Sequence, residues 1–177
     1  NKTFHLLREQ LDTSYVDYNI PEITSDDVVG GFRNGWGLFI INMDAAREQI
    51  LIQVPHPCDD FIAPYIALDL FFETDAFGFM IAGAGREVAW NEIGDYSNSK
   101  SISDPSRYPH TVFQKFQDAV TEPLIGVNPH WPLVFAIHSF DNQTHLERKP
   151  IIMAAGWQNP FTTKPIRDIT NDHFDII

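Results

Sequence analysis

The sequence predicts a single α/β domain over residues 1–177, in which helices flank a mixed β-sheet. Two observations carry this prediction. Short apolar runs, such as Gln49–Val54 and Leu133–Ile137, are typical of buried strands, and segments with apolar residues at helical spacing lie between such runs. Strands that alternate with helices favour a sheet covered by helices. A chain of 177 residues, of which 44% are hydrophobic, is also long enough to bury a substantial core.

The first expected elements are an N-terminal helix and a pair of strands. Apolar residues within 1–12 recur at helical spacing and predict a short helix there. The runs Trp36–Asn42 and Gln49–Val54 predict two strands. Because only a short connection separates these runs, we expect the two strands to pair as an antiparallel hairpin.

An apolar run from Phe61 to Phe72 predicts the next helix. Asp60 precedes this run and can cap the helix, because a carboxylate accepts hydrogen bonds from the unpaired N–H groups of a first turn. Pro64 is compatible with the first turn, where the N–H that proline lacks has no helical partner. We expect three residues to form the core face of this helix: Ile66, Leu70 and Phe71.

The second half of the chain continues the alternation. Phe77–Ala82 is an uninterrupted apolar run, which is typical of a central strand. Residues 88–107 predict a long polar loop, and residues 110–120 predict a helix from their apolar spacing. Leu133–Ile137 and Pro150–Ala155 predict two more buried strands.

The charge balance narrows the classes of partner. The formal net charge is −12, from 24 acidic residues against 12 lysines and arginines, and no basic run is present. We therefore do not expect a nucleic acid or an anionic membrane as a partner. No apolar run reaches the roughly 18 residues of a membrane span. The chain begins at Asn1 without methionine, which indicates a mature or trimmed form. Oligomeric state and compartment do not follow from the sequence.

Residues with metal-binding character follow two of the predicted strands. His56, Asp59 and Asp60 come just after the predicted strand Gln49–Val54. His138 comes directly after the predicted strand Leu133–Ile137. In open α/β sheets, ligands collect at the C-terminal ends of the strands. Two imidazoles with one carboxylate suit a zinc ion that keeps one position open for water. Zinc lowers the pKa of such a water and polarises a carbonyl group.

Alternatives stay open from the residues alone. Asp60 can be only a helix cap, and His56 only a turn residue between two prolines. Cys58 near His56 suggests a cysteine–histidine nucleophile, but side chains two residues apart around a proline rarely reach hydrogen-bond distance, so a small apolar role for Cys58 is favoured. As the only cysteine, Cys58 excludes an internal disulfide and a multi-cysteine zinc site. Asp104 lies in the long loop. We expect it to be a solvated acid, and the alternative is a residue that supports a metal ligand.

Three stretches give the chain a resemblance to a known family: Val54–Asp60, Ala82–Arg86 and Ile137–Phe140. Their sequences are Val-Pro-His-Pro-Cys-Asp-Asp, Ala-Gly-Ala-Gly-Arg and Ile-His-Ser-Phe. In this order and spacing they resemble zinc-dependent hydrolases related to N-formylglutamate amidohydrolases and, more distantly, to zinc carboxypeptidases. The resemblance spans about residues 49–156. It implies a phosphorylase/hydrolase-like fold, similar to that of zinc exopeptidases.

The resemblance also implies a reaction and residue roles. His56 and His138 would bind zinc, with Asp60 or Asp59 as the third ligand, and a water activated by the metal would attack an amide or peptide carbonyl. The substrate would be a small molecule or a peptide. Arg86 would hold a carboxylate of that substrate, because a planar guanidinium grips two oxygens at once. An ion pair between Arg86 and Glu87 or Asp95, two acids that follow it in the chain, is the alternative.

The chain departs from the family pattern at three positions. Gly85 stands where the family has histidine, Pro64 stands where a glutamate is expected, and Ser139 replaces a glycine after the late histidine. A general-base glutamate cannot be assigned, although Glu147 lies near His138 in the sequence. These departures favour a rival expectation, a non-catalytic member of the fold that binds a ligand or partner. A third interpretation, a structural domain with coincidental histidines, predicts that the histidines lie far apart.

Overall fold

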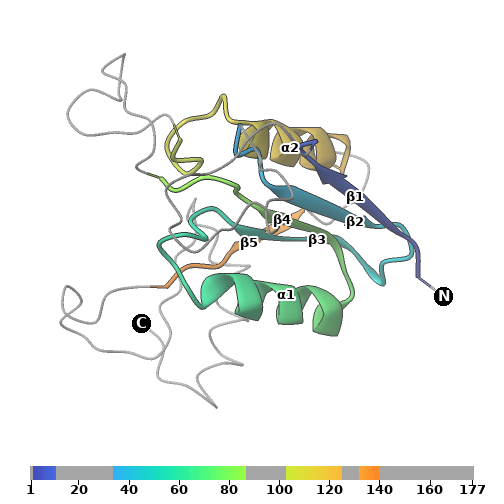
Figure 1. Ribbon diagram of the computed structural model, residues 1–177. Coiled ribbons are helices and arrows are strands. Elements are labelled where there is room, and N and C mark those ends of the chain that lie inside the picture. The colour runs from blue at the N-terminus through green and yellow to red at the C-terminus, as the bar shows by residue number, and fades with distance from the viewer. Residues whose placement is uncertain (1, 11–33, 87–102, 125–131, 140–177) are drawn as a thin grey trace, which may run out of the picture. The chain divides into compact units, whose positions relative to one another are not determined.

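The computed structural model describes four stretches of the chain: 2–10, 34–86, 103–124 and 132–139. All four belong to one compact unit, Asn1–Ser139. Within them, five strands form one mixed sheet and two α-helices pack against it (Figure 1). The expected α/β class with a mixed sheet is confirmed. The predicted strand Pro150–Ala155 lies outside the described residues, so a single domain over 1–177 stays a prediction.

The strands are β1 (Phe4–Arg8), β2 (Leu38–Asn42), β3 (Arg47–Val54), β4 (Ala76–Ile81) and β5 (Leu133–Ala136). Their order across the sheet is β1-β2-β4-β3-β5. β2 runs antiparallel to both of its neighbours, whereas β3 runs parallel to both β4 and β5. The three parallel strands therefore end at the same edge of the sheet, which brings the turns after them together.

β4 lies between β2 and β3, so the expected hairpin of β2 with β3 is wrong. Both predicted strands exist, but each pairs with β4, where Ile81 lies opposite Leu38 on one side and Val54 on the other. Phe79 and Met80 of β4 are adjacent and both buried, so this strand is covered on its two faces. A strand of this kind is most stable in the interior of a sheet, where its backbone pairs on both sides. The prediction of a central strand at Phe77–Ala82 is confirmed.

β1 replaces the expected N-terminal helix, so that prediction is wrong. Phe4 to Arg8 pair with β2, with Phe4 opposite Asn42 and Arg8 opposite Leu38. A short isolated helix is only marginally stable in water. The edge of β2, by contrast, supplies a partner for the backbone of these residues. The Phe4 ring also packs against Phe71, with the ring centroids 6.0 Å apart.

α1 (Ala63–Thr74) covers one face of the sheet. Ile52 of β3 and Phe79 of β4 form a core cluster with its buried side chains, which are Ala63, Ala67 and Phe71. The expected core face is correct for Phe71 but wrong for Ile66 and Leu70, which are 43% and 37% exposed. Two alanines on the buried face let the helix lie close to the sheet, and this close approach decides which side of an almost wholly apolar helix turns inward.

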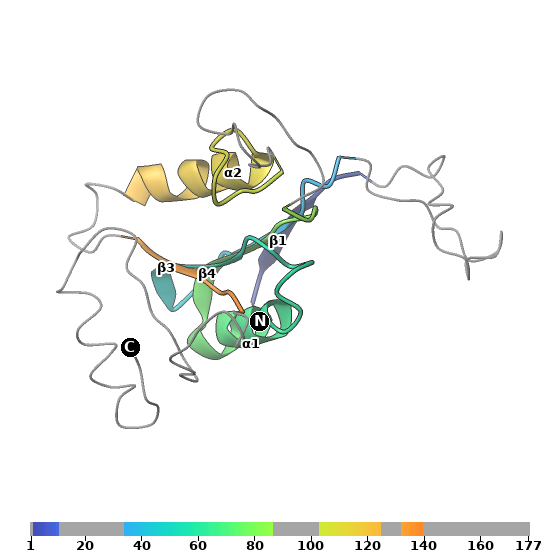
Figure 2. The same cartoon turned by 90° about the vertical axis from the view of Figure 1, so that its left-hand side faces the viewer.

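α2 (Val112–Thr121) covers the opposite face, as Figure 2 shows with the sheet seen nearly edge-on. Leu51 and Met80, the neighbours of Ile52 and Phe79 along their strands, form a second core cluster with Phe113 of this helix. Side chains alternate between the faces of a strand, so the two clusters lie on opposite sides. Thr111 caps α2 by accepting a hydrogen bond from the Gln114 backbone N–H at 3.1 Å. Neither α-helix of the described stretches combines the length and apolar character needed to cross a membrane.

Two glycine positions let the turn after β4 lie directly on the segment before β2. A Cβ on Gly83 would come within 2.5 Å of the Gly37 backbone nitrogen. Gly37 itself has φ +103°, a conformation that residues with a side chain rarely adopt. This backbone contact sets the path of the turn from Gly83 to Arg86, which borders the site described next.

Candidate metal centre

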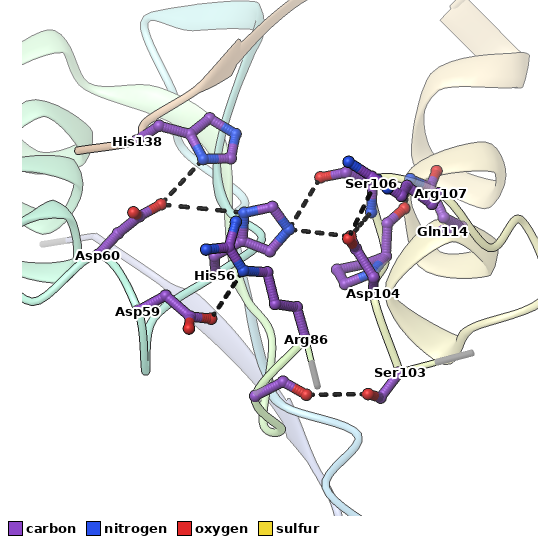
Figure 3. Close-up of polar contacts among 12 residues, drawn as sticks. His56, Asp59, Asp60, Arg86, Ser103, Asp104, Ser106, Arg107, Gln114 and His138 are labelled. Atoms are coloured by element: carbon purple, nitrogen blue, oxygen red, sulfur yellow. Dashed lines mark hydrogen bonds and ion pairs between the residues drawn. The ribbon is translucent and has the colours of Figure 1, made fainter. Parts of the chain in front are cut away.

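The candidate site lies where the three parallel strands end. His56 follows β3, the turn that leads to Arg86 follows β4, and His138 follows β5 (Figure 3). The position agrees with the general rule that ligands bind beyond the C-terminal ends of strands in open α/β sheets. Residues more than eighty positions apart in the chain therefore meet, because the order of the strands places their ends side by side.

Asp60 reaches the site from the turn between β3 and α1. The backbone N–H groups of Asp59 and Asp60 both donate to the His56 carbonyl, at 3.1 and 2.8 Å, which closes this turn tightly. The role expected for Asp60 as a helix cap is wrong, since the cap residue is Ile62 and no side chain caps the helix. The Asp60 carboxylate instead contacts the end of β5, with Oδ2 2.9 Å from His138 Nδ1 and Oδ1 3.0 Å from the donating Ser139 hydroxyl.

His56, Asp60 and His138 form a cluster that could hold a metal ion. One potential ligand atom from each residue lies within 4.8 Å of the other two. The ring centroids of the two histidines are 4.9 Å apart, and His56 Nδ1 is 4.0 Å from Asp60 Oδ2. His56 and Asp60 are buried, whereas the side chain of His138 is 40% exposed. The interpretation that the histidines lie far apart is therefore wrong.

Asp104 completes the surroundings of His56. Its Oδ1 is 2.9 Å from His56 Nε2, and the residue is only 6% exposed, so the expectation of a solvated loop acid is wrong. Nothing in the sequence distinguishes Asp104 from the other acids of its polar loop, because its burial depends on a contact with a distant strand end. The Ser106 hydroxyl also lies 3.2 Å from His56 Nε2, and the Ser106 N–H donates to Asp104.

The contact with Asp104 assigns the protons of His56. A carboxylate accepts hydrogen bonds and has none to donate, so Nε2 of His56 carries the proton and donates it to Asp104. When the ring is neutral, Nδ1 is the acceptor nitrogen, and it lies 4.0 Å from Asp60 Oδ2. A nitrogen lone pair and a carboxylate oxygen that face each other attract a cation between them.

Asp59 takes a different direction from Asp60 and lies outside the cluster of three. Its Oδ2 is 3.5 Å from Arg86 Nε, with both side chains partly exposed (Figure 3). Arg86 therefore lies at the rim of the site, paired with an acid from the same turn that carries Asp60. Cys58 is exposed, so the expected role as a buried apolar side chain is wrong. Glu147 lies outside the described residues.

A hollow of about 310 Å³ lies beside the site but does not contain the cluster. Ser103 and Pro105 line it, together with residues such as Trp36 and Phe113, and none of the three clustered residues does. Asp104 lies between Ser103 and Pro105 in the chain. The segment that supports His56 therefore also forms a wall of the hollow.

The chain matches no protein-family model, no curated protein and no solved structure.

Proposed function

We propose that this chain is a zinc-dependent hydrolase that cleaves an amide or peptide bond, with the metal held by His56, Asp60 and His138. In this proposal the sheet is a divergent form of the phosphorylase/hydrolase-like fold of zinc exopeptidases. The substrate is a small molecule or peptide that carries a carboxylate. The observation that carries the proposal is the cluster of His56, Asp60 and His138, in which one potential ligand atom from each residue lies within 4.8 Å of the other two.

The donor set fits zinc. Two imidazole nitrogens and one carboxylate oxygen match the three protein ligands of a catalytic zinc site, which leaves the fourth position open. The ligand atoms of a tetrahedral zinc site lie roughly 3.3 Å apart, from metal–ligand distances of about 2.0–2.1 Å. The distances of Asp60 Oδ2 from the two histidine nitrogens, 2.9 and 4.0 Å, lie on either side of that value. Partial exposure of His138 leaves the open position accessible to a substrate.

When bound, zinc supplies a Lewis acid for the carbonyl group and lowers the pKa of a coordinated water. The surrounding residues supply orientation. Asp104 accepts the Nε2–H of His56, which in a neutral ring selects the tautomer whose acceptor nitrogen, Nδ1, lies on the side of Asp60. The Ser139 hydroxyl donates to Oδ1 of Asp60, so that Oδ2, which contacts His138 Nδ1, is the oxygen turned toward both histidines and is the one that would bind the metal. Arg86, at the rim, is the cation that can bind the carboxylate of the substrate.

A non-catalytic relative that binds a ligand without cleaving it is the second candidate, and a specific observation favours it. The described stretches place three acids around the cluster, and each is engaged: Asp60 with His138 and Ser139, Asp104 with His56, and Asp59 with Arg86. None of these carboxylates is left over as a general base. Pro64, at the start of α1 where the family has an acid, adds to this argument.

Metal content tests the proposal first. The wild type, His56→Ala, His138→Ala and the control His5→Ala are dialysed against zinc and then against buffer, and bound zinc is measured by elemental analysis. We expect about one zinc per chain in the wild type and in the control, whose histidine is exposed on β1, and a loss in the two other variants. Absence of zinc from the wild type, or full zinc in His138→Ala, contradicts the proposed site.

Hydrolysis separates the two candidates. The wild type is assayed on a panel of N-acylated amino acids, before and after removal of the metal with a chelator. Activity that disappears with the metal and returns with added zinc supports the hydrolase. Stoichiometric zinc without hydrolysis of any member of the panel supports the non-catalytic relative, and activity that survives metal removal contradicts the zinc mechanism.

A further inference from the structure

We propose that the carboxylate of Asp59 pairs with Arg86 while the site is empty, and that the carboxylate of the substrate replaces Asp59 on Arg86 when the substrate binds. This inference rests on the proposed function, since it concerns the same site, and it adds a residue that sets specificity. The sequence assigns Asp59 as a candidate zinc ligand. The structure instead pairs it with Arg86, the candidate substrate-binding residue.

The backbone holds Asp59 in place beside the cluster. Its N–H donates to the His56 carbonyl at 3.1 Å, and the next residue, Asp60, donates to the same carbonyl. Asp60 in turn is held by His138 and Ser139. The backbone of Asp59 is therefore fixed one residue from a candidate metal ligand, and its carboxylate pairs with Arg86 at the rim of the site.

The contact between Arg86 and Asp59 leaves most of the guanidinium unused. The ion pair joins Nε of Arg86 to a single carboxylate oxygen, at 3.5 Å. A charge-assisted hydrogen bond is shorter, about 2.7–2.9 Å, and an arginine can form two in parallel with one carboxylate. Asp59 is the one acid that the described stretches pair with Arg86. The carboxylate of a ligand is not attached to the turn, so it can orient itself to form two parallel hydrogen bonds with the Arg86 guanidinium, which Asp59 does not form.

The side chains of Arg86 and Asp59 are exposed enough for a ligand in solution to reach them. The side chains of Arg86 and Asp59 are 45% and 32% exposed. An ion pair at this level of exposure is weak, because water screens the charges and the long side chain loses freedom. A ligand with a carboxylate can thus displace Asp59, whereas a neutral ligand gains nothing from Arg86 and leaves the ion pair intact. Asp59 in this way lowers the affinity for carboxylates and prevents Arg86 from remaining an unpaired charge when the site is empty.

Ligand binding to the purified 177-residue chain tests this inference without requiring turnover. N-acetyl-L-leucine and its uncharged primary amide are titrated by calorimetry into the wild type, Asp59→Asn, Arg86→Gln and the double variant. Asp69→Asn is the matched control, because Asp69 is an exposed acid on α1 and its change removes the same charge. Circular dichroism confirms that each variant is folded.

We expect the wild type to bind the acid more tightly than the amide. Asp59→Asn should tighten binding of the acid by roughly two- to fivefold, the size expected for removal of a weak competing ion pair, and should leave binding of the amide unchanged. Arg86→Gln should abolish the preference for the acid, and the double variant should match Arg86→Gln, since Asp59 acts only through Arg86. Asp69→Asn should behave as the wild type.

Two results overturn the inference in distinguishable ways. If Asp59→Asn binds the acid as the wild type does while Arg86→Gln loses the preference, Asp59 is no competitor, although Arg86 still binds the carboxylate. If the wild type does not prefer the acid to the amide, the carboxylate specificity in the proposed function fails together with the inference. The zinc measurements above stand independently of both results.

Discussion

Nε2 of His56 lies 2.9 Å from Oδ1 of Asp104, although 48 positions separate the two residues in the chain. Asp104 lies near the end of the polar loop, before α2, and the side-chain amide of Gln114 in α2 donates to the carbonyl of Pro105. The helix on one face of the sheet therefore holds the acid that orients His56. Asp60 lies in the turn before α1, and its carbonyl accepts a hydrogen bond from the N–H of Ala63, the first residue of that helix, so the helices on both faces contribute to the position of one cluster.

Replacement of Asp104 should weaken metal binding without removing a ligand. Loss of a partner that orients a ligating histidine typically costs about 10- to 100-fold in metal affinity, and we expect this range for Asp104→Ala. Asp104→Asn should cost less, because its amide oxygen can still accept the Nε2–H of His56. Competition with a zinc chelator measures the affinity, and Asp118→Asn, an acid on α2 whose side chain is 45% exposed and pairs with Lys115, is the control. Equal affinities of Asp104→Ala and wild type would show that Asp104 does not fix the tautomer of His56.

Ser106→Ala distinguishes metal chemistry from a serine nucleophile. The Ser106 hydroxyl is 3.2 Å from His56 Nε2, a distance that also fits a serine activated by a histidine base. However, the shorter contact of Nε2 with Asp104 makes this nitrogen a donor, which cannot accept the serine proton. We therefore expect zinc affinity and hydrolysis in Ser106→Ala to remain within about threefold of the wild type. Loss of hydrolysis with full zinc content would favour the serine mechanism.

Gly83→Ala should destabilise the fold and disturb the turn that carries Arg86. The added Cβ would meet the backbone at Gly35 and Gly37, which cannot move aside as a side chain can. We expect a loss of roughly 1–3 kcal/mol, as is typical when atoms are forced into a packed site. Urea unfolding measures the change. Gly78→Ala is the comparison, because the one close contact of its Cβ would be with the end of the Leu51 side chain, and the Ile40 carbonyl oxygen lies at an ordinary 3.8 Å. A larger loss in Gly78→Ala than in Gly83→Ala would contradict the argument.

The stability of the fold should depend on pH through Asp75, at the junction of α1 and β4. A hydrogen bond from the Lys2 side chain is the main cause that holds the pKa of Asp75 below its ordinary value of 3.8, with help from the Ala46 N–H and the Asn42 amide and against the effect of desolvation. The pKa of Asp75 is thus lower in the folded than in the unfolded chain. The stabilisation is therefore complete above the unfolded pKa and is lost as pH falls through the folded pKa.

Asp75→Asn should accordingly unfold at a lower urea concentration than the wild type at about pH 7, and the difference should shrink as the pH approaches about 3. Unfolding midpoints at several pH values measure this trend. Asp69→Asn, which changes an exposed acid, should show no such trend. A difference between Asp75→Asn and wild type that grows toward low pH would contradict the direction of the pKa shift.

Local patterns in the sequence were sufficient to predict most of the elements. The strands near 36–42, 49–54, 77–82 and 133–137 and the helices near 61–72 and 110–120 are all present, within a few residues at their ends. The failures share one cause. β1, the neighbours of β2 and β3, and the inward face of α1 all depend on which segment lies beside another, and apolar spacing along the chain does not contain that information.

The sequence by itself determined which residues have ligand chemistry and that His56, Asp60 and His138 lie near the ends of strands, because runs of apolar residues mark where each strand stops. Only the tertiary structure decided that the two histidines meet, that Asp60 faces them while Asp59 faces Arg86, and that Asp104 is buried against His56. These facts follow from the insertion of β4 between β2 and β3 and from the parallel alignment of β3 with β5, which bring distant strand ends to one edge. Contacts between residues far apart in the chain depend on how the whole sheet packs, and no short stretch of sequence specifies them.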